Sequence, residues 1–160
     1  MERLFAIIDR GVELFVAAIL ATMCVVGLLQ VFNRFVLNAS LSWSEEGQIF
    51  GHVWLVFLGI GIAYRRGAHM YVETFREKFP RRFGAAFDLA VELMWAAFAV
   101  SLVYLGYRVA QVAALQLSPG LEVPMSTVYY GMVLGGAYLG LVALRRIAAW
   151  LHRSRQRTSA

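Results

Sequence analysis

The chain has 160 residues, of which 60% are apolar and only 16% are charged. Soluble domains contain roughly 45–50% apolar and about 25% charged residues, and a chain this short has too little interior to bury so much hydrocarbon. The composition therefore excludes an ordinary soluble domain and indicates an integral membrane protein. The net charge of +5 does not indicate nucleic acid as a partner, because clustered arginines in a membrane protein report its orientation.

Four stretches of the chain are long and apolar enough to cross a bilayer, which takes about 20 mostly apolar residues. The first, second and fourth contain long uncharged runs, at residues 14–33, 47–64 and 123–144. The third carries Asp88, Glu92 and Arg108 inside it or at its edges. We therefore expect one all-α transmembrane domain over residues 1–160, with spans at approximately 12–34, 44–64, 83–114 and 124–146.

The first span could instead be the apolar segment of a cleaved signal peptide. Its apolar run is longer than such a segment usually is, its flank mixes acids with bases, and no polar stretch with a cleavage site follows it. We therefore interpret it as a retained transmembrane helix.

The basic residues predict how the four spans are oriented. All of the 15 except Arg34 and Arg108 lie before the first span, between the second and third, or after the fourth. The loop between the third and fourth spans holds the acid Glu122 and no base. Because Lys and Arg accumulate on the cytoplasmic side, we expect both termini and the middle loop in the cytoplasm.

Short amphipathic stretches accompany the spans. Apolar residues alternate with charged ones over residues 2–10, and over residues 71–79 apolar side chains recur at helical spacing until Pro80. Such stretches are typical of short helices that lie in the membrane interface. Trp150, among basic residues after the fourth span, is typical of an interfacial anchor.

The second span is preceded by a polar segment with two adjacent acids. Ser42 and Glu45 have the spacing of a capping box, and Glu45 and Glu46 both suit the positive end of a helix dipole. A helix start therefore explains the segment, and a partner-binding role stays open beside it. Two adjacent carboxylates exceed the need of one cap, which favours pairing of Glu46 with a basic residue of a partner.

The fourth span carries two pairs of glycines at four-residue spacing, Gly131 with Gly135 and Gly136 with Gly140. Small residues at this spacing let helices approach closely in lipid, where hydrophobic burial does not drive helix association. The pattern predicts close helix packing rather than a binding site.

The sequence offers little for catalysis or for a cofactor. Haem held by two histidines needs them at matching depth on facing helices, whereas His52 lies near the outer end of the second span and His69 and His152 on the cytoplasmic side. The single cysteine, Cys24, lies in an apolar run and allows neither a disulfide nor a cysteine metal cluster within the chain. Metal-ligand sets and phosphate-binding loops are also missing from the sequence, so we expect no enzyme and no cofactor.

Carboxylates inside the membrane are functional candidates because burying them is costly. Asp88 and Glu92 share one face of the third span, near its cytoplasmic end and within reach of Arg81 or Arg82. An ion relay would favour carboxylates near the midplane with unwound backbone around them. Depth therefore favours pairing with another helix or subunit over ion coupling.

Taken together, several segments resemble the small membrane subunit of tripartite ATP-independent periplasmic (TRAP) transporters. Each segment is weak alone, but they cover nearly the whole chain in the right order. They are residues 30–38, 40–46, 54–59, 65–69, 72–73 and 118–125, with Tyr129 and the Gly135-Gly136 pair. Gly120 departs from the pattern, where alanine or a larger side chain would be expected.

The resemblance implies a three-part transporter in a bacterial inner membrane, driven by a sodium or proton gradient. A periplasmic protein captures an organic anion, commonly a carboxylate or sugar acid, and a large membrane subunit carries the substrate and ion sites. The small subunit binds the large one laterally and enlarges its fixed scaffold, so it needs no substrate site of its own.

We expect structural or subunit-interface roles for ten residues of this chain. Those on the cytoplasmic side are Arg66 and His69. Those on the periplasmic side are Arg34, Asn38, Ser42, Trp43, Glu45, Glu46, Pro119 and Pro124.

A self-sufficient four-helix exporter, with Glu13 as its proton-coupled carboxylate, is the main alternative function. Glu13 follows Arg10 closely and lies at the membrane edge, which disfavours this function. A structural membrane protein of an unrelated assembly is a third option. Genes for a large permease and a periplasmic binding protein beside this one would favour the transporter subunit.

Overall fold

A computed structural model of the chain describes residues 2–39, 41–67 and 81–158. It contains the helices α1 (Glu2–Val36), α2 (Ser42–Arg65), α4 (Arg81–Ala113) and α5 (Ser126–Thr158). Each includes a segment long and apolar enough to cross a membrane, which confirms the all-α fold with four transmembrane helices. His69 and the amphipathic stretch 71–79 lie outside the described residues.

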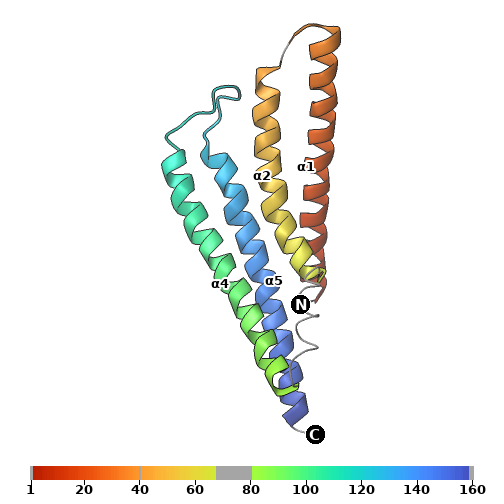
Figure 1. Cartoon of the computed structure of the whole chain (residues 1–160), viewed down its shortest axis with the longest axis vertical. Helices are drawn as coiled ribbons and strands as arrows, with labels where there is room; N and C mark the ends of the chain where they lie inside the picture. Colours follow the sequence, from red (N-terminus) through yellow and green to blue (C-terminus); the bar gives the residue numbers. More distant parts are fainter. Residues whose placement is uncertain (1, 40, 68–80, 159–160) are drawn as a thin grey trace.

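The four helices stand side by side in a row rather than in chain order (Figure 1). α1 packs on α2, α2 packs on α5, and α5 packs on α4. α5, the last helix of the chain, therefore lies between α2 and α4. We call the end where residues 114–125 join α4 to α5 the loop end, and the end that holds Arg65, Arg66, Arg145 and Arg146 the arginine-rich end.

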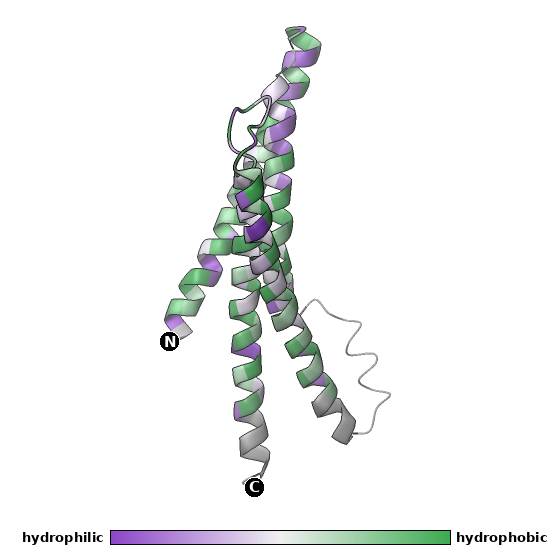
Figure 2. Ribbon diagram, turned by 90° about the vertical axis from the view of Figure 1, so that its left-hand side faces the viewer, coloured by the Kyte–Doolittle hydropathy of each residue, from purple (hydrophilic) through white to green (hydrophobic). Residues whose placement is uncertain are grey.

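α1 lies at one edge of the row and leaves most of its apolar surface uncovered. The amphipathic residues 2–10 form the first turns of this continuous helix rather than a separate interfacial element. Hydrophobic residues predominate along the helices (Figure 2). An apolar surface of this size is unfavourable in water, so lipid or another subunit must cover it. The large apolar side chains that α1 exposes include Leu14, Leu20, Val25, Leu28, Val31 and Phe32.

The buried core lies along α5, which packs against α2 on one side and against α4 on the other. Tyr138, Leu139, Val142 and Ala143 of α5 are buried together with residues of the two flanking helices. The contributing side chains of α4 and α2 are Ala99, Leu102 and Tyr64.

The glycines of α5 let both neighbours approach, as the spacing of the two pairs predicts. A Cβ on Gly135 would lie 2.6 Å from the backbone carbonyl of Phe57 in α2. A Cβ on the next residue, Gly136, would lie 2.8 Å from the Cβ of Leu102 in α4. Real Cβ atoms do not come this close to such atoms, so these two positions require glycine.

Candidate functional site

Buried carboxylates tie the helices together at the arginine-rich end. Asp9 of α1 is only 5% exposed. Its Oδ1 accepts a hydrogen bond of 3.0 Å from the Tyr138 hydroxyl, and its Oδ2 accepts one of 3.0 Å from Arg145 Nη1. Arg65 Nη1 lies 3.4 Å from the same Oδ2. Asp9 thereby joins α1 to α5, although α2 separates these two helices along most of their length (Figure 1).

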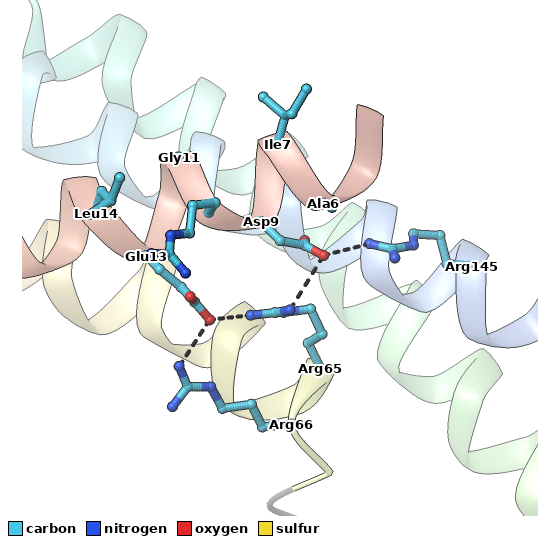
Figure 3. A pocket seen from close by; sticks show the side chains of 10 residues that line it. Ala6, Ile7, Asp9, Gly11, Glu13, Leu14, Arg65, Arg66 and Arg145 are labelled. Atoms are coloured by element: carbon cyan, nitrogen blue, oxygen red, sulfur yellow. Dashed lines mark hydrogen bonds and ion pairs between the residues drawn. The ribbon is translucent and has the colours of Figure 1, made fainter. Parts of the chain in front are cut away.

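Glu13 extends this cluster one turn further along α1. Its Oε1 accepts hydrogen bonds from Arg65 Nη2 and, at 2.9 Å, from Arg66 Nη2. Residues four apart lie on the same face of a helix, so Asp9 and Glu13 both face the end of α2. Figure 3 shows the two carboxylates alternating with the three guanidinium groups of Arg65, Arg66 and Arg145.

A second buried carboxylate, Glu92, ties α4 to the other helices. It accepts hydrogen bonds from the Tyr64 hydroxyl of α2 and, at 2.8 Å, from Arg146 Nε of α5. Arg146 also donates from Nη1 to the backbone carbonyl of Tyr64 at 2.8 Å, and its guanidinium lies 4.6 Å from the centre of the Tyr64 ring. The preference for interhelical pairing over an ion relay is thereby supported for Glu92, whose partners are on α2 and α5.

The cluster around Asp9 and Glu13 and the cluster around Glu92 together form an interhelical network, which we call the polar lock. Asp9 and Glu92 each pair with a tyrosine and an arginine from other helices, and Glu13 pairs with Arg65 and Arg66. Each of these carboxylates therefore has a partner of opposite charge. Removing one partner of a buried pair costs about 3–5 kcal/mol. The lock consists of Asp9, Glu13, Tyr64, Arg65, Arg66, Glu92, Tyr138, Arg145 and Arg146.

Most of the polar lock was missed at the level of sequence. Arg65, Arg145 and Arg146 were interpreted only as signs of orientation, and Asp9 only as part of an amphipathic lead. The four-residue spacing of Asp9 and Glu13, opposite a pair of adjacent arginines, is the signal that could have indicated it.

At the loop end, Glu46 of α2 holds the connection between α4 and α5. Its Oε2 accepts hydrogen bonds from the Ser118 hydroxyl, from the Gly120 amide at 2.9 Å and from the Leu121 amide at 3.0 Å. A carboxylate that accepts backbone amides in this way makes charge-assisted bonds, which are about twice as strong as neutral ones. One side chain of α2 thus fixes the conformation of a loop that lies more than 70 residues later in the chain.

The backbone of this loop is shaped to meet the carboxylate. Leu117 and Pro124 form an isolated antiparallel bridge, and the Ser118 amide donates to the Val123 carbonyl at 2.9 Å. A Cβ on Gly120 would lie 3.0 Å from Glu46 Oε2 and 3.3 Å from the Ser42 carbonyl. Glycine at this position, unexpected from the family resemblance, is explained by the close approach of Glu46.

The predicted capping box is not formed, and this expectation was wrong. α2 has Leu41 as its N-cap and no side-chain hydrogen bond at that cap. The helix starts at Ser42, one residue earlier than a Ser42 cap requires, so its hydroxyl is not in the capping position. Glu45 lies 3.4 Å from Gln30 Nε2 of α1 instead, and Glu46 contacts the loop.

The other residues singled out in the sequence lie mostly exposed at the loop end. Arg34 is in the last turn of α1, 6.0 Å from the centre of the Phe35 ring, and Asn38 follows that helix in a left-handed conformation with φ of 51°. Arg66 lies apart from them in the polar lock. The members of the exposed set are Arg34, Asn38, Ser42, Trp43, Glu45, Pro119 and Pro124.

Most of the sequence matches one known protein family. Residues 23–153 match the family described as Tripartite ATP-independent periplasmic transporters, DctQ component. The chain belongs to this family. The resemblance noted in the sequence is thereby confirmed, and this DctQ chain is a small permease subunit of the TRAP type with four transmembrane helices.

Individual relatives of this DctQ chain carry the same description. The sialic acid TRAP transporter small permease protein SiaQ of Vibrio cholerae is 25% identical over 92% of this chain and 85% of its own length. A putative TRAP transporter small permease protein of Haemophilus influenzae is 23% identical over 92% of this chain and 91% of its own length. The C4-dicarboxylate small permease protein DctQ of Vibrio cholerae is 24% identical over 59% of this chain and 40% of its own length. These relatives are transporter components rather than enzymes.

Proposed function

We propose that this chain is the scaffold subunit of a secondary, ion-gradient-driven TRAP transporter that takes up organic anions, such as carboxylates or sugar acids. In this function it binds a large membrane subunit in the bacterial inner membrane, and a periplasmic binding protein delivers the substrate. The chain itself contributes no transport site. Its membership of the DctQ family and the names of its relatives support this proposal.

The polar lock is the observation that carries the scaffold role. A single row of helices has fewer contacts than a closed bundle and would flex easily if only apolar side chains joined it. Asp9 and Glu92 add ion pairs that connect the edge helices α1 and α4 to α5. A row of helices held together by these ion pairs can keep its shape while the large subunit changes conformation, which is what a scaffold must do.

The proposed orientation places both termini and the arginine-rich end in the cytoplasm. The basic residues support it, because Lys and Arg flank spans on the cytoplasmic side. The loop end, with the loop that Glu46 holds, is then periplasmic. That is the side from which a binding protein delivers its ligand.

Interface roles are proposed for the residues exposed at the loop end. Arg34, Trp43 and Glu45 are accessible there. Arginine and tryptophan are also the residue types that most often contribute strongly to binding at protein interfaces. The role first inferred for Glu46 changes in part, since its Oε2 already binds the loop of its own chain.

The exporter alternative is disfavoured by the environment of Glu13. A proton-coupled carboxylate must gain and lose its proton during each cycle. Glu13 is paired with both Arg65 and Arg66, and two adjacent guanidinium groups hold a carboxylate in its ionised form.

Reconstitution into liposomes tests the proposal. The chain alone should move neither sialic acid nor a C4-dicarboxylate under a sodium or proton gradient. Uptake should appear when the large subunit is co-reconstituted and the binding protein is added outside. Gradient-driven transport by the chain alone would contradict the proposal and support the exporter.

A further inference from the structure

An open cavity of about 920 Å³ lies beside the polar lock, where α1, α2 and α5 meet. Its volume is in the range of small-molecule sites, about 300–1,000 Å³. Four guanidinium groups and two carboxylates line it, which leaves an excess of two positive charges. The close-up in Figure 3 shows most of these groups converging on it. The excess predicts an anionic ligand.

The lining has more hydrogen-bond donors than its own carboxylates accept. Asp9 and Glu13 are shared among Arg65, Arg66 and Arg145. The fourth base, Arg10, is exposed and has no ion pair with the side chains that the structure describes, those of residues 3–39, 41–67 and 87–152. Arg65 Nε is buried without an acceptor among the same residues. Guanidinium groups with spare donors match the paired oxygens of a phosphate.

The same cavity has an apolar wall on α1. Ile7 is 68% exposed and Leu14 is 61% exposed, one on each side of the charged residues Asp9, Arg10 and Glu13. A small inorganic anion gains nothing from such a wall. An amphiphile with a charged head and hydrocarbon chains matches both parts of the lining, and basic pockets between transmembrane helices are known to suit acidic lipid headgroups.

We propose that this cavity binds the phosphodiester headgroup of an acidic phospholipid from the membrane leaflet at the arginine-rich end. Arg10 and Arg66 contact the phosphate, and the acyl chains lie along Ile7 and Leu14 of α1. The lipid bridges α1 and α2 at the place where the polar lock joins them. Its phosphodiester carries one negative charge and thereby halves the excess of two positive charges that Asp9 and Glu13 leave in the lining.

Titration of lipid onto the full-length chain in a neutral detergent, followed by native mass spectrometry, tests the proposal. The probes are phosphatidylglycerol, phosphatidylcholine and inorganic phosphate. Phosphatidylglycerol should bind at least fivefold more tightly than phosphatidylcholine, and millimolar inorganic phosphate should not displace it. Equal binding of the two lipids would overturn the proposal, as would displacement by phosphate, which would identify a free-anion site.

Three variants test whether the lipid binds in this cavity rather than elsewhere on the chain. Arg10→Gln should weaken phosphatidylglycerol binding about fivefold, the effect of one arginine near a membrane surface, and it breaks no ion pair of the lock. Glu13→Gln should strengthen binding by a similar factor, because it removes a competing negative charge. Arg108→Gln, an exposed arginine on α4, is the matched control and should bind as the unaltered chain does.

The signs of these effects distinguish a lipid site from a purely structural cluster. If the cluster is purely structural, Glu13→Gln should weaken or abolish phosphatidylglycerol binding. Arg10→Gln and Arg108→Gln should then bind phosphatidylglycerol equally. Either result contradicts the proposal. If Glu13→Gln does not fold, the comparison of Arg10→Gln with Arg108→Gln decides alone.

Discussion

The carboxylate of Glu46 in α2 accepts hydrogen bonds from the Ser118 hydroxyl and from two loop amides. Glu45, its neighbour in sequence, is exposed, and its Oε1 accepts a long hydrogen bond of 3.4 Å from Gln30 Nε2. Two adjacent acids that both suit the start of a helix in the sequence thus have different structural roles. Glu46 fixes a loop of its own chain, whereas Glu45 is available to a partner.

The first prediction compares neutralisation of these two acids. Glu46→Gln should lower the free energy of unfolding by about 1–2 kcal/mol, because hydrogen bonds to a charged acceptor are lost or weakened. Hydrogen exchange at the Gly120 and Leu121 amides should become faster. Glu45→Gln should change stability by less than about 0.5 kcal/mol. Thermal unfolding and hydrogen exchange in detergent measure both effects, and equal effects of the two variants would contradict the assignment.

The second prediction concerns the buried carboxylate of the polar lock. Asp9→Asn should destabilise the chain by about 3 kcal/mol, because Arg145 then loses its charged partner and Arg65 keeps only its pair with Glu13. Tyr138→Phe removes one hydrogen bond from the same carboxylate and should cost about 1 kcal/mol. Tyr104→Phe, at an exposed tyrosine of α4, should change stability by less than about 0.5 kcal/mol. Reversible unfolding in mixed detergent micelles checks this order, and a Tyr138→Phe variant as stable as Tyr104→Phe would contradict it.

The third prediction separates the glycines of α5 by what faces them. Gly135→Ala should cost about 3 kcal/mol, because the added methyl group meets the backbone of Phe57. Gly140→Ala should be neutral or stabilising by up to about 1 kcal/mol, since its Cβ would lie 3.6 Å from Ala99, an ordinary contact, and alanine favours a helix. Thermal unfolding of both variants tests the difference. If the two variants lose similar amounts of stability, the packing of α5 against α2 and α4 differs from the one described.

The fourth prediction concerns orientation in the membrane. A reporter that is active only in the cytoplasm should be active when fused after Arg157 and inactive when fused at Gly120. The reason is the asymmetry of Lys and Arg between the two ends of the helices. The opposite activities would reverse the proposed topology and place the loop held by Glu46 in the cytoplasm.

The sequence predicted the parts of the fold that depend on local pattern. Long apolar runs identified four helices, and the spacing of Gly131, Gly135, Gly136 and Gly140 predicted close packing. Neither required knowledge of which helices are neighbours, because a transmembrane helix satisfies its own backbone and its length follows from the bilayer.

The polar lock could not be predicted in the same way. Asp9 and Arg145 are 136 positions apart, and they meet only because α5 is inserted between α2 and α4. Glu46 could not be assigned to the loop for the same reason. The predicted capping box was wrong because α2 starts one residue earlier than a Ser42 cap requires. Sequence patterns do not locate the start of a helix to a single residue.

The distance between α1 and α5 during transport tests the scaffold role most directly. Spin labels at Leu28 and Leu144, both exposed, can be introduced in a Cys24→Ser background that still supports uptake by the complete transporter. Double electron–electron resonance then gives their separation with and without substrate and an ion gradient. The scaffold role predicts a shift of less than about 2 Å, the scale of rigid partners, while the large subunit changes conformation. A larger, substrate-dependent shift would show that this chain moves with the transported substrate and would contradict the scaffold role.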